Sequence, residues 1–271
     1  MSKLRTLRQG VFLFLTLDDA PTRNALSPEM VDALRAAFAA AATDEDVRAV
    51  VLRGANGTFC AGGSMGDFQK HQLTSVAAGK PDPIALNNRR FGEFMTALQL
   101  FPKVLVVVVE GAAMGGGLGL ASVADILLVR KDAKFALSET TLGLVPAQIA
   151  PFVVARIGQA QTRRLALSGE RIDGTEAARI GLANIVCDDA IGLEGALVAI
   201  LRGIGSCAPG ANAATKSLIA QCGVLPLAQV LDHASALFAR QMRSEGAEGV
   251  GAFRDKRDAA WVKRIEQLPE P

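Results

Sequence analysis

The sequence has few of the side chains that often mark functional sites. Among its 271 residues there are no tyrosines, one tryptophan, two histidines and four cysteines, and aromatic residues make up only 5%. The cysteines are Cys60, Cys187, Cys207 and Cys222. They lie far apart, with no CxxC and no Cys/His cluster, which argues against a zinc site or a disulfide framework. We therefore expect reduced thiols and a cytoplasmic protein.

A strong charge of either sign and a long apolar run are also missing. The net charge is only +2, and basic and acidic residues are interspersed, so no electrostatic surface for a nucleic acid or an anionic membrane is expected. No apolar run approaches the roughly 18 residues of a membrane span. The start, MSKLRTLRQG, leads directly into VFLFLTL without the pattern of a signal peptide. These absences predict neither a nucleic acid nor a membrane as partner.

The chain is rich in apolar residues, which make up 50% of it, and their spacing predicts an α/β protein. We expect a hairpin over 4–17 turning at Gln9-Gly10, a helix that begins after the N-cap Ser27, a strand from Ala49, and a mobile loop or irregular helix over 65–80. A helix over 83–100 is expected to carry the apolar residues Leu86, Phe91, Phe94, Met95 and Leu98.

Strands joined through glycine turns and helices predict parallel pairing. After about residue 170 helical spacing dominates. We therefore predict a core over 1–190 and a helical region over 191–271.

The stretch over 103–125, KVLVVVVEGAAMGGGLGLASVAD, reads as a buried strand, a tight turn and a helix. Three successive glycines start the helix, and its free N–H groups would favour an oxygen that carries negative charge. Close packing of helix on strand is the alternative. A second glycine-rich segment, GANGTFCAGGSM, follows the strand that starts at Ala49.

Three motifs together resemble one family. FCAGGSM, GAAMGGGLGLASVADI and KFALSETTLGLVP resemble motifs of the crotonase (enoyl-CoA hydratase/isomerase) superfamily, and the likeness extends to APTRNALSPEM, DGTEAARIGLANIV and EGVGAFRDKRDAAW. The resemblance implies a crotonase-like spiral of ββα repeats with a C-terminal helical trimerisation region. It also implies an acyl-CoA thioester substrate and a homotrimer or dimer of trimers, with no metal and no cofactor besides the coenzyme A of the substrate.

The resemblance assigns three catalytic positions. The N–H groups of Gly63 and Gly116 would hold the thioester oxygen and stabilise its enolate. Glu139 would be the general acid/base, with a pKa raised by burial among Leu137, Leu142 and Val145. An ordinary N-cap or salt-bridging glutamate is the alternative for Glu139.

Eight further positions would bind substrate or coenzyme A. They are Arg23, Ala25, Ala61, Gly62, Met65, Gly115, Phe253 and Lys256. Arg23 would contact phosphates, Ala61 would receive the adenine, and the pair Phe253 and Lys256 would close over the coenzyme A of the same or a neighbouring subunit. A solvated Arg23 and a packing role for Phe253 remain open.

Two positions depart from the family pattern. Hydratases of this superfamily usually carry a second glutamate where this chain has Gly119, and most members have Asp where it has Ser64. A single glutamate is what enoyl-CoA isomerases keep. A non-catalytic acyl-CoA binder is a further alternative.

A finer likeness favours a hydratase. GGGLGL with SETTLGLVPAQIAPFVVARIG resembles a branch that hydrates methylglutaconyl-CoA or isohexenylglutaconyl-CoA in leucine and acyclic terpene breakdown. We expect the carboxylate of such a substrate, or water held by it, to replace the missing glutamate. Arg90 is a candidate contact for that carboxylate, although Arg89 and Arg90 could be plain surface charges. Cys60 is expected to be a small buried side chain rather than a nucleophile.

Overall fold

We describe the protein from a computed structural model, over residues 3–73, 75–76 and 79–269. The main sheet contains β1 (Leu4–Gln9), β2 (Phe12–Leu17), β3 (Ala49–Gly54), β4 (Val104–Val109), β6 (Ile126–Arg130) and β9 (Ile185–Cys187), in that order. Among the described pairings of this sheet only β1 with β2 is antiparallel, so the predicted parallel pairing is confirmed. A small second sheet contains β5 (Ala112–Met114), β7 (Lys134–Ala136) and β8 (Ile172–Asp173).

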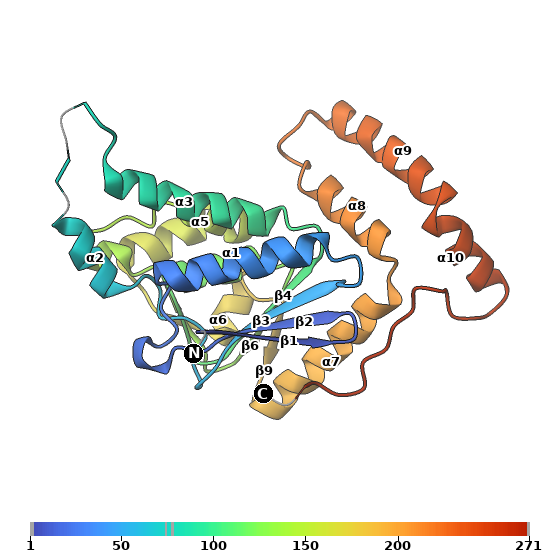
Figure 1. Ribbon diagram of the computed structural model, residues 1–271, viewed down its shortest axis with the longest axis horizontal. Helices are drawn as coiled ribbons and strands as arrows, with labels where there is room; N and C mark the ends of the chain where they lie inside the picture. Colours follow the sequence, from blue (N-terminus) through green and yellow to red (C-terminus); the bar gives the residue numbers. More distant parts are fainter. Residues whose placement is uncertain (1–2, 74, 77–78, 270–271) are drawn as a thin grey trace.

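Helices cover both faces of the main sheet (Figure 1). On one face lie α1 (Pro28–Thr43), α3 (Pro83–Gln99), α4 (Gly116–Ser122) and α5 (Ala150–Ser168), and on the other lies α7 (Ala190–Ser206). The short helices are α2 (Met65–Gln72), α6 (Gly174–Arg179) and the 3₁₀ turns η1 (Ala20–Thr22) and η2 (Glu139–Leu142). The predicted α/β architecture is confirmed.

The strands divide the core into two layers because successive side chains point to opposite faces. In β4, Leu105, Val107 and Val109 pack toward α1 and α3, whereas Val106 and Val108 pack toward α7. All five are buried, as expected for a strand covered on both faces.

Local signals in the sequence locate the helices well. The Ser27 Oγ accepts a hydrogen bond of 3.3 Å from the Met30 N–H, and α1 begins at Pro28 as predicted. The predicted helix over 83–100 is present as α3, in which Leu86 is 53% exposed. The buried residues of α3 begin only at Gly92, so the first turns of the helix have no core beneath them.

Residues 65–80, predicted as a loop or irregular helix, begin with the helix α2 of 8 residues. Its start is capped by Ser64, whose Oγ accepts a hydrogen bond of 3.4 Å from the Asp67 N–H. Ser64 therefore bonds a nearby backbone N–H, as its hydroxyl group allows. Thr74, Ala77 and Ala78 lie outside the described residues.

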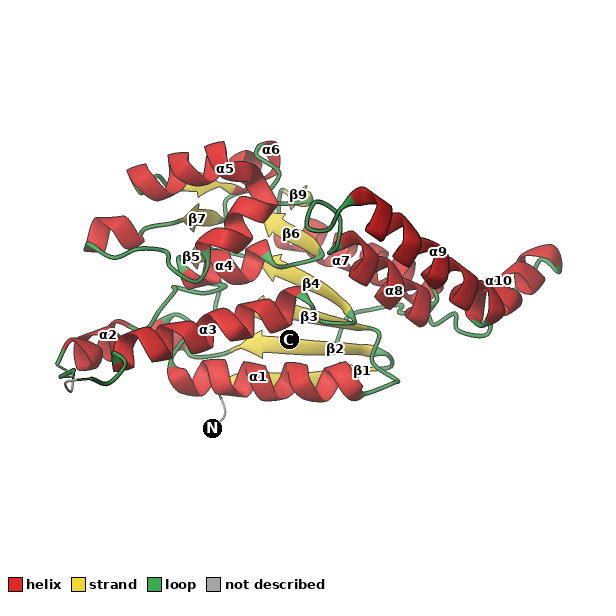
Figure 2. Ribbon diagram, turned by 90° about the horizontal axis from the view of Figure 1, so that it is seen from above, coloured by secondary structure: helices red, strands yellow, loops and turns green. Residues whose placement is uncertain are grey.

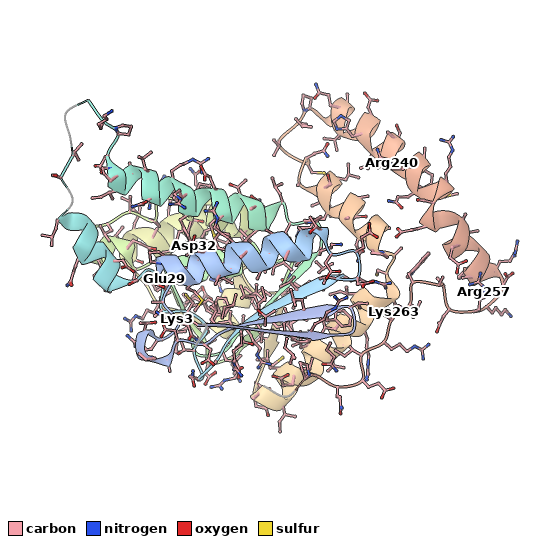
Figure 3. All side chains as sticks on the ribbon, in the orientation of Figure 1. Lys3, Glu29, Asp32, Arg240, Arg257 and Lys263 are labelled. Carbon is pink, nitrogen blue, oxygen red and sulfur yellow. The ribbon has the colours of Figure 1, made fainter. Side chains whose placement is uncertain are left out.

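The last three helices project away from the sheet (Figures 1 and 2). We call α8 (Pro209–Ile219), α9 (Leu227–Arg243) and α10 (Glu245–Arg254) the C-terminal arm. The chain then returns to the core, and Figure 3 shows Arg257 at the far end of the arm and Lys263 beside the sheet. There the Lys263 N–H donates a hydrogen bond of 2.9 Å to the Gly205 carbonyl. Helix α7 begins at the predicted boundary near residue 190, but it packs on the sheet and not in the arm. The predicted division into a core over 1–190 and a helical region over 191–271 stays a prediction.

Among the described residues, no single helix is long and apolar enough to cross a membrane. Together α7 and α8 meet the criterion by length and composition, but they are bent by 102° at the break between them.

Candidate active site

The two glycine-rich segments that follow β3 and β4 lie side by side. The Cys60 N–H donates to the Ala112 carbonyl at 2.8 Å, and the Met114 N–H donates to the Cys60 carbonyl at 3.0 Å. These bonds form the bridge between Cys60 and Ala113. The two glycine-rich segments recognised in the sequence are thus paired and form one side of the candidate site.

A third segment, residues 23–26, pairs with the glycine-rich segment that follows β3. The Ala61 N–H donates to the Arg23 carbonyl at 3.0 Å, and the Leu26 N–H donates to the Gly62 carbonyl at 2.8 Å. The buried Asn24 fastens this segment, since its Nδ2 donates a hydrogen bond of 2.8 Å to the Thr58 carbonyl. Our reading of the sequence missed this role of Asn24. The only signal was an amide side chain in the otherwise matched APTRNAL motif.

Gly63 and Gly116 present their backbones to the same space. A β-carbon on Gly116 would stand 4.0 Å from the Gly63 nitrogen, 2.9 Å from Leu26 Cδ1 and 3.8 Å from Phe91 Cζ. In the described part of the chain no acceptor is found for either N–H, and Gly116 is the first residue of α4, where helical N–H groups have no partner in the helix. Two free donors between apolar side chains suit an oxygen that becomes negatively charged.

The three successive glycines meet three different neighbours. A β-carbon on Gly115, where φ is 48°, would stand 2.8 Å from Glu139 Oε1. One on Gly117 would stand 2.7 Å from the Cys60 carbonyl oxygen. Both interpretations of the GGG motif therefore apply, because Gly116 offers a donor while Gly117 allows close packing.

Glu139 begins η2 and places its carboxylate against Gly115. Its Oε2 is buried and has no hydrogen-bond partner among the described residues. Burial raises the pKa of Glu139, an effect only partly offset by a backbone hydrogen bond. The predicted direction is correct, but two of the predicted neighbours are not buried, because Leu142 and Val145 are 54% and 73% exposed.

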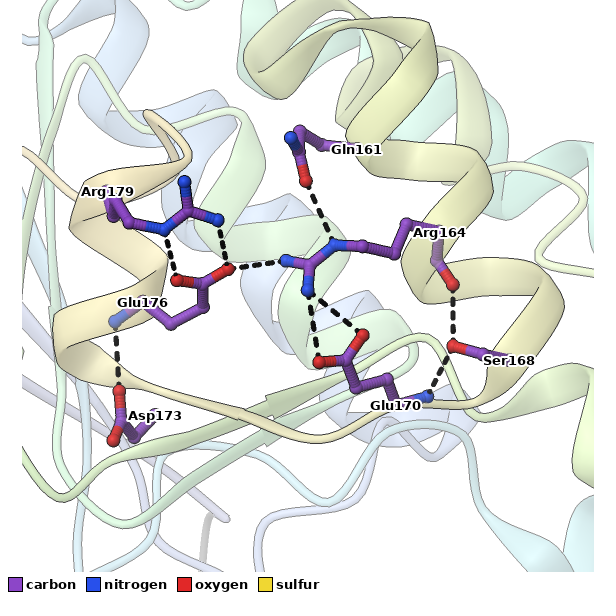
Figure 4. A network of polar contacts seen from close by, with 7 residues as sticks. All are labelled: Gln161, Arg164, Ser168, Glu170, Asp173, Glu176 and Arg179. Atoms are coloured by element: carbon purple, nitrogen blue, oxygen red, sulfur yellow. Dashed lines mark hydrogen bonds and ion pairs between the residues drawn. The ribbon is translucent and has the colours of Figure 1, made fainter.

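A polar network holds the far end of α5, to which η2 is bonded (Figure 4). The Thr140 Oγ1 donates to the Ala166 carbonyl at 2.7 Å. Two residues before Ala166, Arg164 pairs with Glu170 at 3.0 Å and with Glu176 at 2.6 Å, and Arg179 shares Glu176. The guanidinium groups lower the pKa of Glu176 to about 2. The network joins α5 to α6, while the Thr140 bond joins η2 to α5.

Ile149 occupies the space beside Gly119. A β-carbon on Gly119 would stand 2.5 Å from Ile149 Cγ2 and 3.6 Å from Met95 Cε. Both residues are buried, and they come from α3 and from the residue before α5. Position 119 therefore has no room for a longer side chain unless Ile149 moves.

The whole chain, and not only these motifs, matches one family. The profile of the enoyl-CoA hydratase/isomerase family matches residues 7–264. The chain belongs to this family. It is 31% identical to 2,3-dehydroadipyl-CoA hydratase of Escherichia coli over 259 residues, which are 95% of this chain and 97% of the relative.

Solved structures of this family share the fold. An enoyl-CoA hydratase/isomerase from Marinobacter aquaeolei superposes with a TM-score of 0.93 at 43% identity, and the match covers 97% of this chain and 100% of that one. Pseudomonas aeruginosa AtuE gives 0.91 at 45% identity, covering 96% and 100%. The predicted crotonase-like fold with a C-terminal helical region is confirmed.

The structure brings together most of the residues expected to bind substrate in this hydratase/isomerase family member. Arg23, Ala25, Ala61, Gly62 and Met65 lie on the two paired segments next to Gly63 and at the start of α2. Arg23 is exposed, and its φ of 54° turns the chain there. Their binding roles stay predictions.

Phe253 and Lys256 lie elsewhere. Phe253 is on α10 with 88% of its surface exposed, and Lys256 follows that helix. Both views place α10 at the end of the molecule opposite α2 (Figures 1 and 2). Within one chain, this pair does not reach the site around Gly63 and Gly116.

Cys60 has the properties of a packing residue. It is fully buried beneath α4, and burial raises the pKa of its thiol to about 12. Such a thiol is not ionised at neutral pH and is a poor nucleophile, as expected. No group of three His, Cys, Asp or Glu side chains in the described residues is placed to hold a metal ion.

Proposed function

We propose that the protein hydrates a 3-branched glutaconyl-CoA thioester, such as isohexenylglutaconyl-CoA or methylglutaconyl-CoA, in acyclic terpene or leucine breakdown. The observation that carries this proposal is the single buried carboxylate of Glu139 beside the Gly63–Gly116 donors, with Ile149 filling the space at Gly119. A substrate that brings its own carboxylate supplies the group for which position 119 has no room.

In the proposed reaction, the N–H groups of Gly63 and Gly116 hold the thioester oxygen and draw electron density from the conjugated double bond. Glu139 takes a proton from water while the water oxygen bonds to carbon 3, and the electron pair of the double bond moves to the thioester oxygen as an enolate. The enolate then collapses and carbon 2 takes the proton back from Glu139. The raised pKa of Glu139 suits a group that both accepts and returns a proton.

The substrate's carboxylate, or water held by it, orients the attacking water in place of a second glutamate. No charged side chain among the described residues contributes to the raised pKa of Glu139, so the chain itself offers no close ionised partner. The Escherichia coli relative is named for 2,3-dehydroadipyl-CoA, which is also a dicarboxylic thioester. This supports a diacid substrate.

We also propose that the arm is covered by other copies of the chain in a trimer or a dimer of trimers. Exposed apolar side chains recur along α9, where Leu227, Leu231 and Phe238 are 73%, 58% and 69% exposed. Phe253 and Lys256 would then reach the coenzyme A in a neighbouring subunit. All four cysteines are free thiols, which supports the cytoplasmic location in this proposal.

The test is a comparison of two substrates on the same enzyme. We expect kcat/KM for a 3-substituted glutaconyl-CoA to exceed that for crotonyl-CoA, with loss of the conjugated enoyl absorbance and a product heavier by one water. Equal rates on the two thioesters would contradict the proposal. A product of unchanged mass would identify an isomerase instead.

A further inference from the structure

The face of α3 that borders the site carries polar residues one turn before its apolar ones. Phe91 Cζ lies 3.8 Å from the position of a β-carbon on Gly116, and Met95 Cε lies 3.6 Å from the corresponding point on Gly119. Asn88 and Gly92 share this face, since residues three and four apart are neighbours on a helix. Asn88 lies about 4.5 Å along the helix axis before Phe91, and Gly92 is the residue directly after it.

Gln148 joins the loop after η2 to this polar group. Its Nε2 donates a hydrogen bond of 2.9 Å to Asn88 Oδ1, and its Oε1 lies so close to Gly92 that a β-carbon there would overlap it. Glycine within a helix costs about 1 kcal/mol relative to alanine. Here Gly92 lets the side-chain amide of a half-buried glutamine rest on the helix.

Arg89 extends its guanidinium group to the same place. Arg89 Nη1 lies 3.1 Å from the position of a β-carbon on Gly92, on the side where Gln148 rests. Among the described residues no carboxylate pairs with Arg89, and Glu93 one turn further on does not. An unpaired guanidinium beside two amide groups is well suited to a carboxylate, which it can bind through two parallel hydrogen bonds.

Arg90 lies on the other side of α3. Its backbone carbonyl accepts a hydrogen bond of 3.1 Å from Arg35 Nη1 of α1, and successive helix positions turn by about 100°, so Arg90 flanks the buried face toward α1. The sequence suggested Arg90 as the contact for a substrate carboxylate. The geometry favours its neighbour.

We propose that Arg89, beside Gln148 and Asn88, binds the distal carboxylate of the acyl chain and so sets the preference for a dicarboxylic thioester. In a glutaconyl chain, four C–C bonds separate the distal carboxyl carbon from the thioester carbon, which is about 5 Å when extended. This is close to the rise of about 4.5 Å along α4 from the donor Gly116 to Gly119, where Ile149, the neighbour of Gln148, fills the space. The carboxylate oxygens that pair with Arg89 keep further lone pairs, which can hold water.

This inference rests on the proposed function, and its test separates the two. The variant Arg89→Met and the matched control Arg90→Met are assayed on 3-methylglutaconyl-CoA and on 3-methylcrotonyl-CoA, which has the same branch without the carboxylate. We expect Arg89→Met to lower kcat/KM for the diacid about 10- to 100-fold, as for loss of a hydrogen bond to a charged group, and to leave the monoacid unchanged. Arg89→Lys should restore part of the diacid activity, and Arg90→Met should change neither substrate.

Binding provides a readout that needs no turnover. Glutaryl-CoA and butyryl-CoA, both saturated, should differ in Kd on the wild type, and Arg89→Met should remove that difference. If the wild type prefers the diacid but Arg89→Met affects both thioesters equally or neither, the role of Arg89 is wrong and the proposed function stands. If the wild type shows no diacid preference in turnover or binding, both ideas are overturned.

Discussion

At Gly117, in the site, a β-carbon on the glycine would stand only 2.7 Å from the carbonyl oxygen of Cys60, whereas the Phe238 side chain on α9 of the arm is 69% exposed to water. The first residue belongs to the site, where backbone segments pack at contact distance and leave the N–H groups of Gly63 and Gly116 free. The second belongs to the arm, where several large apolar side chains of α9 stay exposed. One chain therefore completes its own side of the site but leaves apolar surface on the arm, which the proposed assembly would cover.

The largest effect is expected at the donor glycine. Gly116→Pro removes an N–H that has no acceptor in the described chain, at the first position of α4, where proline is tolerated. The fold should therefore persist while turnover is lost, since one oxyanion donor is worth about 3 kcal/mol. Steady-state kcat measures the loss of turnover, and the circular dichroism spectrum shows whether the fold persists.

The matched control is Gly116→Ala, which keeps the N–H. The closest contact of its β-carbon is the end of the flexible Leu26 side chain at 2.9 Å, so this variant should keep more activity than Gly116→Pro. A folded Gly116→Pro variant with full activity would contradict the assignment of the Gly116 N–H as an oxyanion donor.

An effect on turnover of comparable size is expected at Glu139. Glu139→Gln should lower kcat about 100- to 10,000-fold, the usual contribution of a general acid/base, while the Kd for a thioester stays unchanged. Stopped turnover with intact binding would also exclude a non-catalytic acyl-CoA binder. Turnover at the wild-type rate would show that another group moves the proton.

The same variant reports on the pKa of Glu139. Burial raises this pKa, so the folded state is penalised once the carboxyl group ionises, and the wild type loses stability as pH rises through the raised value. Glu139→Gln should therefore have the higher Tm at neutral pH. The difference should vanish below a pH of about 4, where the carboxyl group is protonated in both states. A Tm difference that is independent of pH would contradict this.

A smaller effect is expected where Ile149 meets Gly119. Gly119→Ala should lower the free energy of unfolding by about 1 to 3 kcal/mol, because the new methyl group overlaps Ile149 Cγ2. In the double variant with Ile149→Ala the overlap with Cγ2 is removed and only the contact of 3.0 Å with the β-carbon remains, so the two changes should be non-additive in urea unfolding. Additive losses would mean that Ile149 does not fill this space.

The smallest effect on stability is expected in the arm. Phe238→Ser should change the free energy of unfolding of the dilute chain by no more than about 0.5 kcal/mol, as for most exposed positions. It should nevertheless lower the molar mass measured by light scattering. Leu167→Ser, at a residue that is 71% exposed on α5, is the control and should leave the mass unchanged. If the two variants have the same mass as the wild type, this face of α9 is not an interface.

Much of the fold could be predicted because its signals are local. The hairpin, the cap at Ser27, the strand over Val104–Val109 and the helices of the arm follow from periodicity and turn residues. Three site positions, Gly63, Gly116 and Glu139, came from motifs, and the structure brings them together. Burial was less predictable, since Leu86 and Val145 have apolar side chains but nothing beneath them.

By itself the sequence determined the family, the order of the strands and helices, and the glycine-rich segments that can approach a ligand, because each depends on residue type and short spacing. The tertiary structure alone decided that Ile149 fills the space at Gly119, that Gln148 rests on Gly92, and that the Arg89 guanidinium lies beside Gly92. The first two contacts join segments far apart in the chain, and their meeting depends on how α3, α4 and the loop before α5 pack together.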